Sequence, residues 1–148
     1  MNQGAHAAML MLVGGAFLAL QAPTNALLAR SVGSPVNAAL VSFLVGSAGL
    51  AVAALLLQAR PDAAAVRALP WWAWLGGLYG AVLVAATAFA APKIGVAAAL
   101  TLVVAGQFVM ALALDHFGAM GLVVRPVNLP KVLGLVLIAA GVLLVRRA

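Results

Sequence analysis

The chain has 148 residues, of which 67% are hydrophobic and 7% are charged, and it contains no cysteine. A soluble domain has about half apolar and about a quarter charged residues, and a small fold cannot hide such an apolar excess from water. This composition excludes a water-soluble enzyme, a disordered chain and a disulfide-stapled secreted module. The net charge of +6 indicates basic residues that flank spans in a lipid bilayer rather than a nucleic-acid-binding surface.

Five stretches are long and apolar enough to cross a bilayer as helices, which takes about 20 residues each. In chain order they cover residues 7–28, 35–57, 71–91, 95–114 and 131–145. Strands of a membrane barrel would alternate and run for only about ten residues. The first stretch lacks the basic start of a signal peptide, because the first Lys or Arg is Arg30, so we expect it to be retained. We therefore predict an all-α membrane protein with five transmembrane helices in a single domain, residues 1–148.

Capping residues stand at several of the predicted boundaries. Ser34 followed by Pro35 is typical of a helix start, with an N-cap and a proline at the first helical position. Asp62 is expected to cap a short turn over residues 63–67. Gly118 stands where a helix end favours a left-handed residue.

Tryptophans and glycines predict how the spans meet their surroundings. Trp71, Trp72 and Trp74 lie together at the start of the third span, where an aromatic belt at the headgroup level is favoured over a place in the core. Glycines inside apolar spans favour close helix packing. We expect that role for Gly14, Gly15, Gly46, Gly49, Gly76, Gly77, Gly80, Gly134 and Gly141.

The Lys and Arg residues divide evenly between the two sides of the predicted membrane. The side of the N-terminus holds Arg60, Arg67, Arg125 and Lys131, and the other side holds Arg30, Lys93, Arg146 and Arg147. Orientation follows the Lys and Arg asymmetry of short loops, so a tie gives no instruction. The tie predicts that one polypeptide inserts in both orientations. The alternative is that the equal count arises by chance among eight charges, and that one loop lies too deep in the membrane to affect orientation.

The first span carries two amides near its middle. Gln21 and Asn25 are four residues apart and therefore share a helix face, with Thr24 beside them. Pro23 lies between them and removes one backbone hydrogen bond, which predicts an interrupted or kinked helix. Such elements bind substrate near the midplane of transporters. The alternative is that both amides only bond to neighbouring helices.

Other polar side chains inside the spans add weaker candidates. Gln107 lies deep in the fourth span, and Tyr79 in the third span offers a hydroxyl to the same cavity or to an amide. Serine and threonine in membrane helices mostly bond to their own backbone. Ser42, Thr87 and Thr101 are therefore weak candidates individually.

Acidic residues are scarce, with no glutamate and with Asp62 and Asp115 as the only aspartates. Asp115 and His116 stand at the end of the fourth span, where they are candidates for proton coupling, although a solvated interfacial pair is the commoner case. His6 and His116 have no cysteine or clustered acid near them in sequence, so no metal site is predicted. No cofactor is predicted either.

Several sequence motifs, taken together, resemble the YdcZ-type inner-membrane exporters of the drug/metabolite transporter superfamily. They are QAPTNALL at 21–28, GSP at 33–35, SFLVG at 42–46, PWW at 70–72, GG at 76–77, GQ at 106–107 and DHFG at 115–118. The resemblance implies a five-span subunit equivalent to half of a ten-span transporter, in families that include dual-topology homodimers. The broad design is also similar to that of small multidrug resistance proteins. Those proteins use a glutamate in the first span, where this chain has Gln21, so their proton exchange cannot be carried over.

These observations together predict a transporter of the inner membrane and not an enzyme. Two copies in opposite orientation would form an antiparallel homodimer, with Gln21, Asn25, Gln107 and Tyr79 lining one substrate pathway that works by alternating access. An uncharged or amphipathic small molecule suits amide donors and acceptors better than an ion. A channel-like pore and a non-transporting assembly subunit are the alternatives.

Overall fold

Residues 3–147, which the computed structural model describes, form helices joined by turns and loops and contain no strand. The long helices are α1 (Gln3–Val32), α2 (Pro35–Leu56), α4 (Gly76–Ile94), α5 (Val96–Phe117) and α6 (Leu129–Arg147). The short elements are α3 (Ala63–Arg67) and the 3-10 turns η1 (Trp71–Leu75) and η2 (Ala119–Gly121). Five candidate spans are long and apolar enough to cross a membrane, and η1 and α4 together form the third. The all-α class with five candidate spans is confirmed.

Caps at the helix ends explain where the elements begin. The Ser34 hydroxyl accepts a hydrogen bond from the Asn37 backbone N–H at 3.0 Å, and Pro35 occupies the first turn of α2. The Asn37 side chain in turn donates to the Val32 carbonyl at 3.0 Å, which satisfies the end of α1. The Asp62 carboxylate accepts from the Ala64 N–H at 2.9 Å, as expected for its cap on α3.

Gly118 ends α5 in the left-handed conformation that the sequence predicts, with φ of +59°. A Cβ atom at this position would lie 2.6 Å from the Cγ2 atom of Val124. The chain therefore needs glycine here both for its backbone conformation and for the close approach of the segment that follows.

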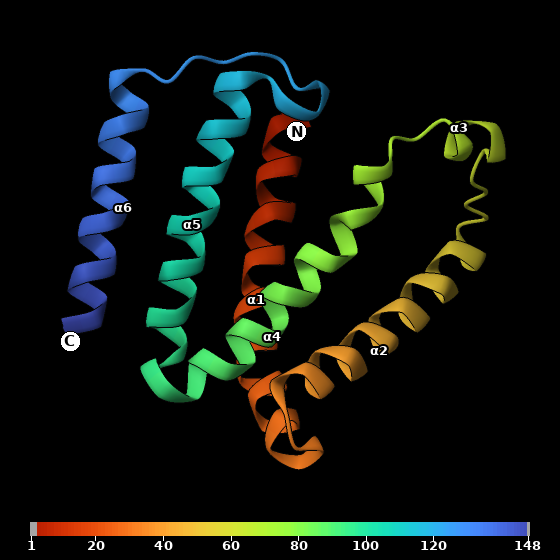
Figure 1. Ribbon diagram of the computed structural model, residues 1–148, viewed down its shortest axis with the longest axis horizontal. Helices are drawn as coiled ribbons and strands as arrows, with labels where there is room; N and C mark the ends of the chain where they lie inside the picture. Colours follow the sequence, from red (N-terminus) through yellow and green to blue (C-terminus); the bar gives the residue numbers. More distant parts are fainter. Residues whose placement is uncertain (1–2, 148) are drawn as a thin grey trace. The chain divides into compact units, whose positions relative to one another are not determined.

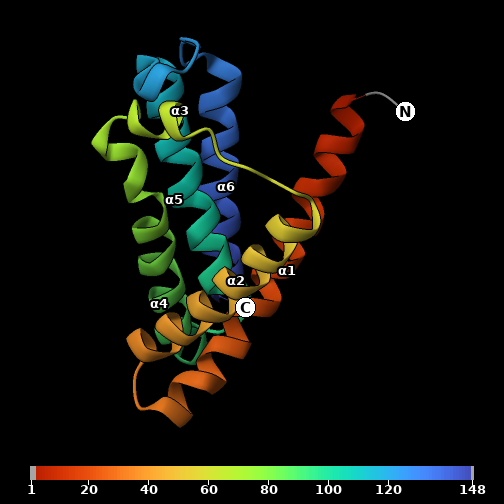
Figure 2. The same cartoon turned by 90° about the vertical axis from the view of Figure 1, so that its right-hand side faces the viewer.

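Contacts divide the chain into two compact units, one ending at Pro92 and the other beginning at Lys93. In the first unit α1 packs against α2, and the two helices diverge from their connecting turn (Figure 1). In the second unit α5 and α6 lie side by side (Figures 1 and 2). The single domain over residues 1–148 stays a prediction.

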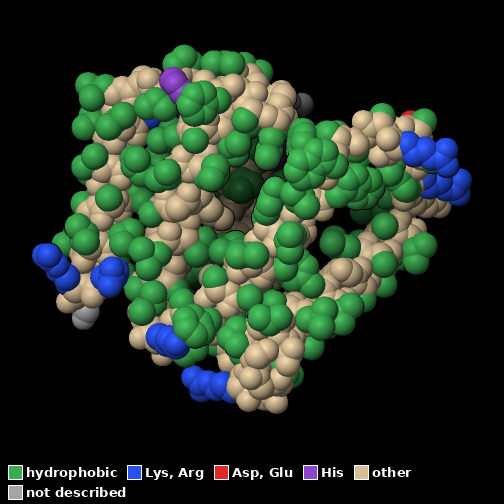
Figure 3. All heavy atoms as spheres, in the orientation of Figure 1, with side chains coloured by type: hydrophobic (Ala, Val, Ile, Leu, Met, Phe, Trp, Pro, Cys, Tyr) green, Lys and Arg blue, Asp and Glu red, His purple; other side chains and the backbone are tan. Residues whose placement is uncertain are grey.

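The buried side chains are small. In the described range they are Ala22, Asn25, Ala26, Ala38, Ala39, Val84, Thr87, Ala88, Ala91, Ala98, Ala99 and Val142. Hydrophobic side chains are spread over the whole face shown in Figure 3, and Lys and Arg lie at the ends of helices or in the loops between them. An apolar surface this extensive requires lipid or another protein around it.

The glycine and tryptophan predictions have mixed outcomes. A Cβ atom on Gly80 would lie 3.1 Å from Cζ of Phe43, and one on Gly134 would lie 3.8 Å from Cζ of Phe108, so close packing is confirmed at these two glycines. The prediction is wrong within this chain for the rest, because their Cβ positions face open space: Gly14, Gly15, Gly46, Gly49, Gly76, Gly77 and Gly141.

Two of the three tryptophans at the start of the third span, Trp71 and Trp74, face outward, and Trp72 is half-buried. Trp71 is 75% exposed and Trp74 is 63% exposed. Side chains this exposed do not fill a core, and their position at the start of a span fits an aromatic belt.

Candidate functional site

The first helix carries the predicted amides without a break at its proline. α1 is continuous from Gln3 to Val32, with Pro23 inside it, so the predicted interruption is wrong. A proline removes one N–H and crowds the carbonyl four residues before it, but α1 runs for 30 residues, and the backbone hydrogen bonds on both sides of Pro23 remain. The Thr24 hydroxyl also donates to the Leu20 carbonyl at 2.8 Å in the same turn.

Gln21 lines a small cavity between α1 and α2. The cavity has a volume of about 180 Å³ and is lined by Gln21, Ser42, Phe43, Gly46, Ser47 and Leu50. The Gln21 side chain is half-buried and makes no hydrogen bond to any residue that the structure describes. The amide therefore keeps its donors and its acceptor available to a ligand.

Asn25 lies one helical turn further along α1 and is 2% exposed. Its Nδ2 atom is buried and has no hydrogen-bond partner among the described residues. A buried donor without a partner costs about 1–3 kcal/mol, so native proteins seldom keep one without a reason. The structure thus supports a polar site at this turn of α1, because the amide lacks the protein partner that a purely structural role requires.

The hydroxyl groups separate into two kinds. Thr87 donates to the Leu83 carbonyl at 3.0 Å, and Thr101 donates to the Ala97 carbonyl, as expected for membrane helices. Every other serine or threonine outside the α1–α2 cavity also makes a hydrogen bond to backbone: Thr24, Ser31 and Ser34.

Ser42 and Ser47, which line the cavity with Gln21, make no side-chain hydrogen bond in the described part of the chain. The expectation that Ser42 bonds to its own helix is therefore wrong. Sequence reasoning underrated this serine and passed over Ser47. Their distance along the chain from the α1–α2 turn could have indicated them. In a helical hairpin, residues equally far from the turn lie opposite each other, and Gln21 is as far from the turn as Gly46, which lies next to Ser47.

The structure does not place Tyr79 and Gln107 with the α1 amides. Tyr79 is 54% exposed on α4 and does not line the Gln21 cavity. The next residue, Gly80, is the one whose Cα side faces the Phe43 ring of α2. Gln107 is exposed on α5, in the second unit. Their participation in a substrate pathway stays a prediction.

Asp115 and His116 lie at the end of α5, where the following segment folds back over them. The Arg125 N–H donates to the Asp115 carbonyl at 2.7 Å, and the Val127 N–H donates to Nδ1 of His116 at 3.3 Å. The Lys131 ammonium donates to the carbonyls of Arg125 and Pro126 at 3.1 and 3.3 Å. Asp115 also lines an open cavity of about 280 Å³ with Leu122, Val123 and Arg125. The pair therefore lies in the last turn of α5 and is held there by hydrogen bonds from the loop that follows.

Metal ligands do not gather within the described residues, since no group of three or more His, Cys, Asp and Glu side chains could hold an ion there. The polar features of the first unit are instead neutral amides and hydroxyls, which can bind a ligand through hydrogen bonds.

Five apolar helices, a surface of hydrophobic side chains and cations at helix ends define a multi-pass helical membrane protein. The family model described as "Putative inner membrane exporter, YdcZ" matches residues 6–144, and the chain belongs to this family. The protein is thus a multi-pass protein of the inner membrane, in an exporter family rather than an enzyme class. No curated protein and no solved structure matches the chain.

Proposed function

We propose that this chain is the half-size subunit of a secondary transporter that exports small neutral or amphipathic molecules. The observation that carries the proposal is the pair of amides on α1, since the Nδ2 atom of Asn25 is buried with no partner in the part of the chain that the structure describes and Gln21 lines a cavity. Membership of an exporter family supplies the class of activity.

The functional unit in this proposal is an antiparallel homodimer of the drug/metabolite transporter type. The equal division of Lys and Arg between the two sides supports insertion in both orientations. The scarcity of large buried side chains supports a chain whose faces are completed by another copy. Two inverted copies would present each polar contact twice, and rocking of one half against the other would give alternating access.

Substrate contacts in the dimer are assigned to Gln21 and Asn25, with Gln107 and Tyr79 as further lining residues from each copy. Neither aspartate of the chain lies in the middle of a span. A neutral ligand is favoured because the site offers hydrogen bonds and has no carboxylate to neutralise a cation.

A counterflow experiment tests the proposal. A thermal-shift screen of neutral and amphipathic compounds on the purified protein first identifies a substrate, since binding to the folded state raises the melting temperature. In proteoliposomes preloaded with unlabelled substrate, we expect saturable, transient accumulation of labelled substrate. Uptake that rises linearly with concentration and shows no exchange would identify a channel-like pore. No flux of any compound that binds would favour a non-transporting assembly subunit.

Asp115→Asn tests coupling at the end of α5. Because Asp115 sits beside an ordered loop at the helix end, we expect the substitution to reduce transport severalfold without abolishing it. Initial rates with and without an imposed proton gradient provide the measurement, and His116→Gln is the companion variant. Complete loss of proton-driven exchange in Asp115→Asn, with substrate binding retained, would instead make this carboxylate the coupling group.

A further inference from the structure

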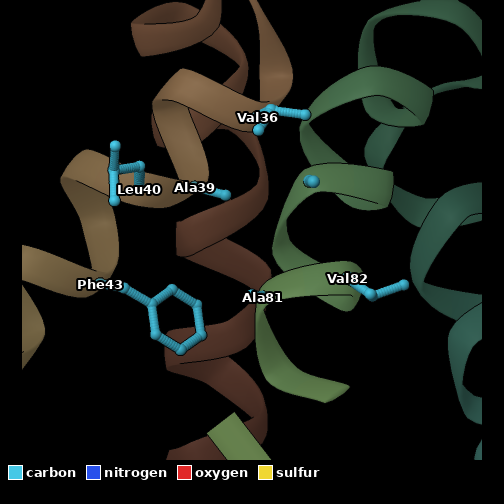
Figure 4. Close-up of a pocket in the computed structure, with 7 residues that line it drawn as sticks. Val36, Ala39, Leu40, Phe43, Ala81 and Val82 are labelled. Atoms are coloured by element: carbon cyan, nitrogen blue, oxygen red, sulfur yellow. The ribbon is translucent and has the colours of Figure 1, made fainter. Parts of the chain in front are cut away.

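Two cavities of the first unit are lined by residues of α2 and meet at Phe43, and we refer to the two cavities together as the groove. The larger has a volume of about 390 Å³ and lies between α2 and α4, lined by Val36, Ala39, Leu40, Phe43, Ala81, Val82 and Ala85 (Figure 4). The smaller is the Gln21 cavity between α2 and α1. The α2 residues that line them recur every three or four positions from Val36 to Leu50, which is the spacing of one helix face.

Phe43 lines both cavities and joins them. Its ring extends from α2 toward the gap between α2 and α4 (Figure 4). The ring tip reaches α4 at Gly80, where an added Cβ would lie 3.1 Å from Cζ. Phe43 therefore stands at the boundary between a compartment with only apolar lining and one with polar lining.

The two compartments differ sharply in chemistry. The larger contains no polar side chain. The smaller presents the amide of Gln21 and the hydroxyls of Ser42 and Ser47, none of which has a side-chain hydrogen bond within the described residues. Because the other serine and threonine hydroxyls are all bonded to backbone, the unused hydrogen-bonding capacity of α2 is concentrated in this compartment.

We propose that this groove binds a neutral amphipathic molecule, with an amide or hydroxyl head at Gln21, Ser42 and Ser47 and an apolar tail between α2 and α4. The inference rests on the proposed transport function and names the substrate class for it. The larger compartment falls within the range of about 300–1,000 Å³ that is usual for small-molecule sites, and such sites combine apolar walls with a few polar groups. The head must be neutral, because the groove has no charged residue to pair with an ion.

Photolabelling in lipid nanodiscs tests the groove without any need for transport. The probe is decanamide with a photoreactive diazirine in its tail, and labelled positions are read by mass spectrometry. We expect labels on the α4 segment 81–85 and on the α2 segment 36–43, and excess unlabelled decanamide should suppress them. The same tail without a head, or with a trimethylammonium head, should label these segments at least about tenfold less. Equal labelling by the headless tail would show a lipid-filled crevice and overturn the proposal.

Substitutions of the polar compartment sharpen the test. The double variant Ser42→Ala with Ser47→Ala should lower decanamide labelling by about tenfold, the effect of losing two ordinary hydrogen bonds. Ser31→Ala is the matched control, because its hydroxyl is already bonded to the Leu27 carbonyl, and it should label like the wild type. Unchanged labelling in the double variant would contradict the assigned head site.

The aromatic boundary offers an independent variant. Phe43→Ala should spread the labels from segment 81–85 into segment 46–50, whereas Leu44→Ala, on an exposed position of the same helix, should leave the pattern unchanged. Absence of labels on both segments in the wild type would also overturn the proposal. Counterflow could still succeed in that case, so failure of the groove and failure of the transport proposal are distinguishable.

Discussion

Two lysines added beside Arg146 and Arg147 should hold every copy with its C-terminus in the cytoplasm, and two added beside Arg60 should hold it outside. The wild type should report both locations, because its short loops carry equal numbers of Lys and Arg on the two sides. These arginines are exposed, Arg146 and Arg147 in the last turn of α6 and Arg60 in the loop between α2 and α3, so neighbouring lysines would enter the same aqueous regions. A C-terminal topology marker that is active on only one side of the membrane measures the fraction in each orientation.

Transport should require copies in both orientations. Each fixed variant alone should transport at a small fraction of the wild-type rate, and co-expression of the two should restore it, because an antiparallel dimer needs one copy of each. Matched variants with two glutamines at the same positions add length without charge and should keep both orientations. A wild-type marker found on one side only, or full activity from one fixed orientation, would exclude the antiparallel dimer and favour a parallel one.

Replacing Asn25 by alanine should abolish transport while leaving expression and dimer formation intact. The reason lies in its amide, whose Nδ2 atom has no hydrogen-bond partner among residues 3–147. Its removal therefore breaks no internal hydrogen bond of that group and also removes a buried unsatisfied donor, which costs about 1–3 kcal/mol. We expect the melting temperature to stay within a few degrees of the wild type. Gln21→Ala should behave in the same way, since its side chain is free on the cavity wall.

Asn37 provides the matched control for these amides. Its side chain donates to the Val32 carbonyl at 3.0 Å and so has a structural role at the end of α1. Asn37→Ala should lower the stability by about 0.5–1.5 kcal/mol, with only a proportionate effect on transport. Loss of assembly together with transport in Asn25→Ala and Gln21→Ala would show that the α1 amides hold helices together, and the cavity hypothesis would fail.

The element boundaries could be predicted because local chemistry determines them. Ser34, Asp62 and Gly118 each act through atoms a few residues away, so their effects can be read from the chain itself. The expected break at Pro23 was wrong because the cost of one proline, about 3 kcal/mol, is spread over a helix of 30 residues whose other backbone hydrogen bonds remain. Close packing was predicted at most of the glycines in the spans, but it occurs where a large side chain of a neighbouring helix lies opposite, as Phe43 lies opposite Gly80.

The candidate site could be predicted only in part. Gln21 and Asn25 were detectable because amides in apolar spans are rare and their spacing fixes a common face. Ser42 and Ser47 were not, because a hydroxyl that bonds to its own helix and one that stays free look alike in sequence. The two kinds are separated by side-chain rotamers, which the sequence pattern does not specify.

The small size of the buried residues in α1 and α2 has a mechanical consequence. Apart from Asn25, the buried positions of these two helices are Ala22, Ala26, Ala38 and Ala39. Larger side chains interlock as ridges and grooves, and sliding past one another forces them through rotamer changes. A methyl group has no such barrier, so α1 and α2 can shear along their contact by small displacements at low cost. The hairpin can thus serve as a sliding joint, and Asn25, the buried polar residue described in these two helices, adds no hydrogen bond from Nδ2 that would oppose the sliding.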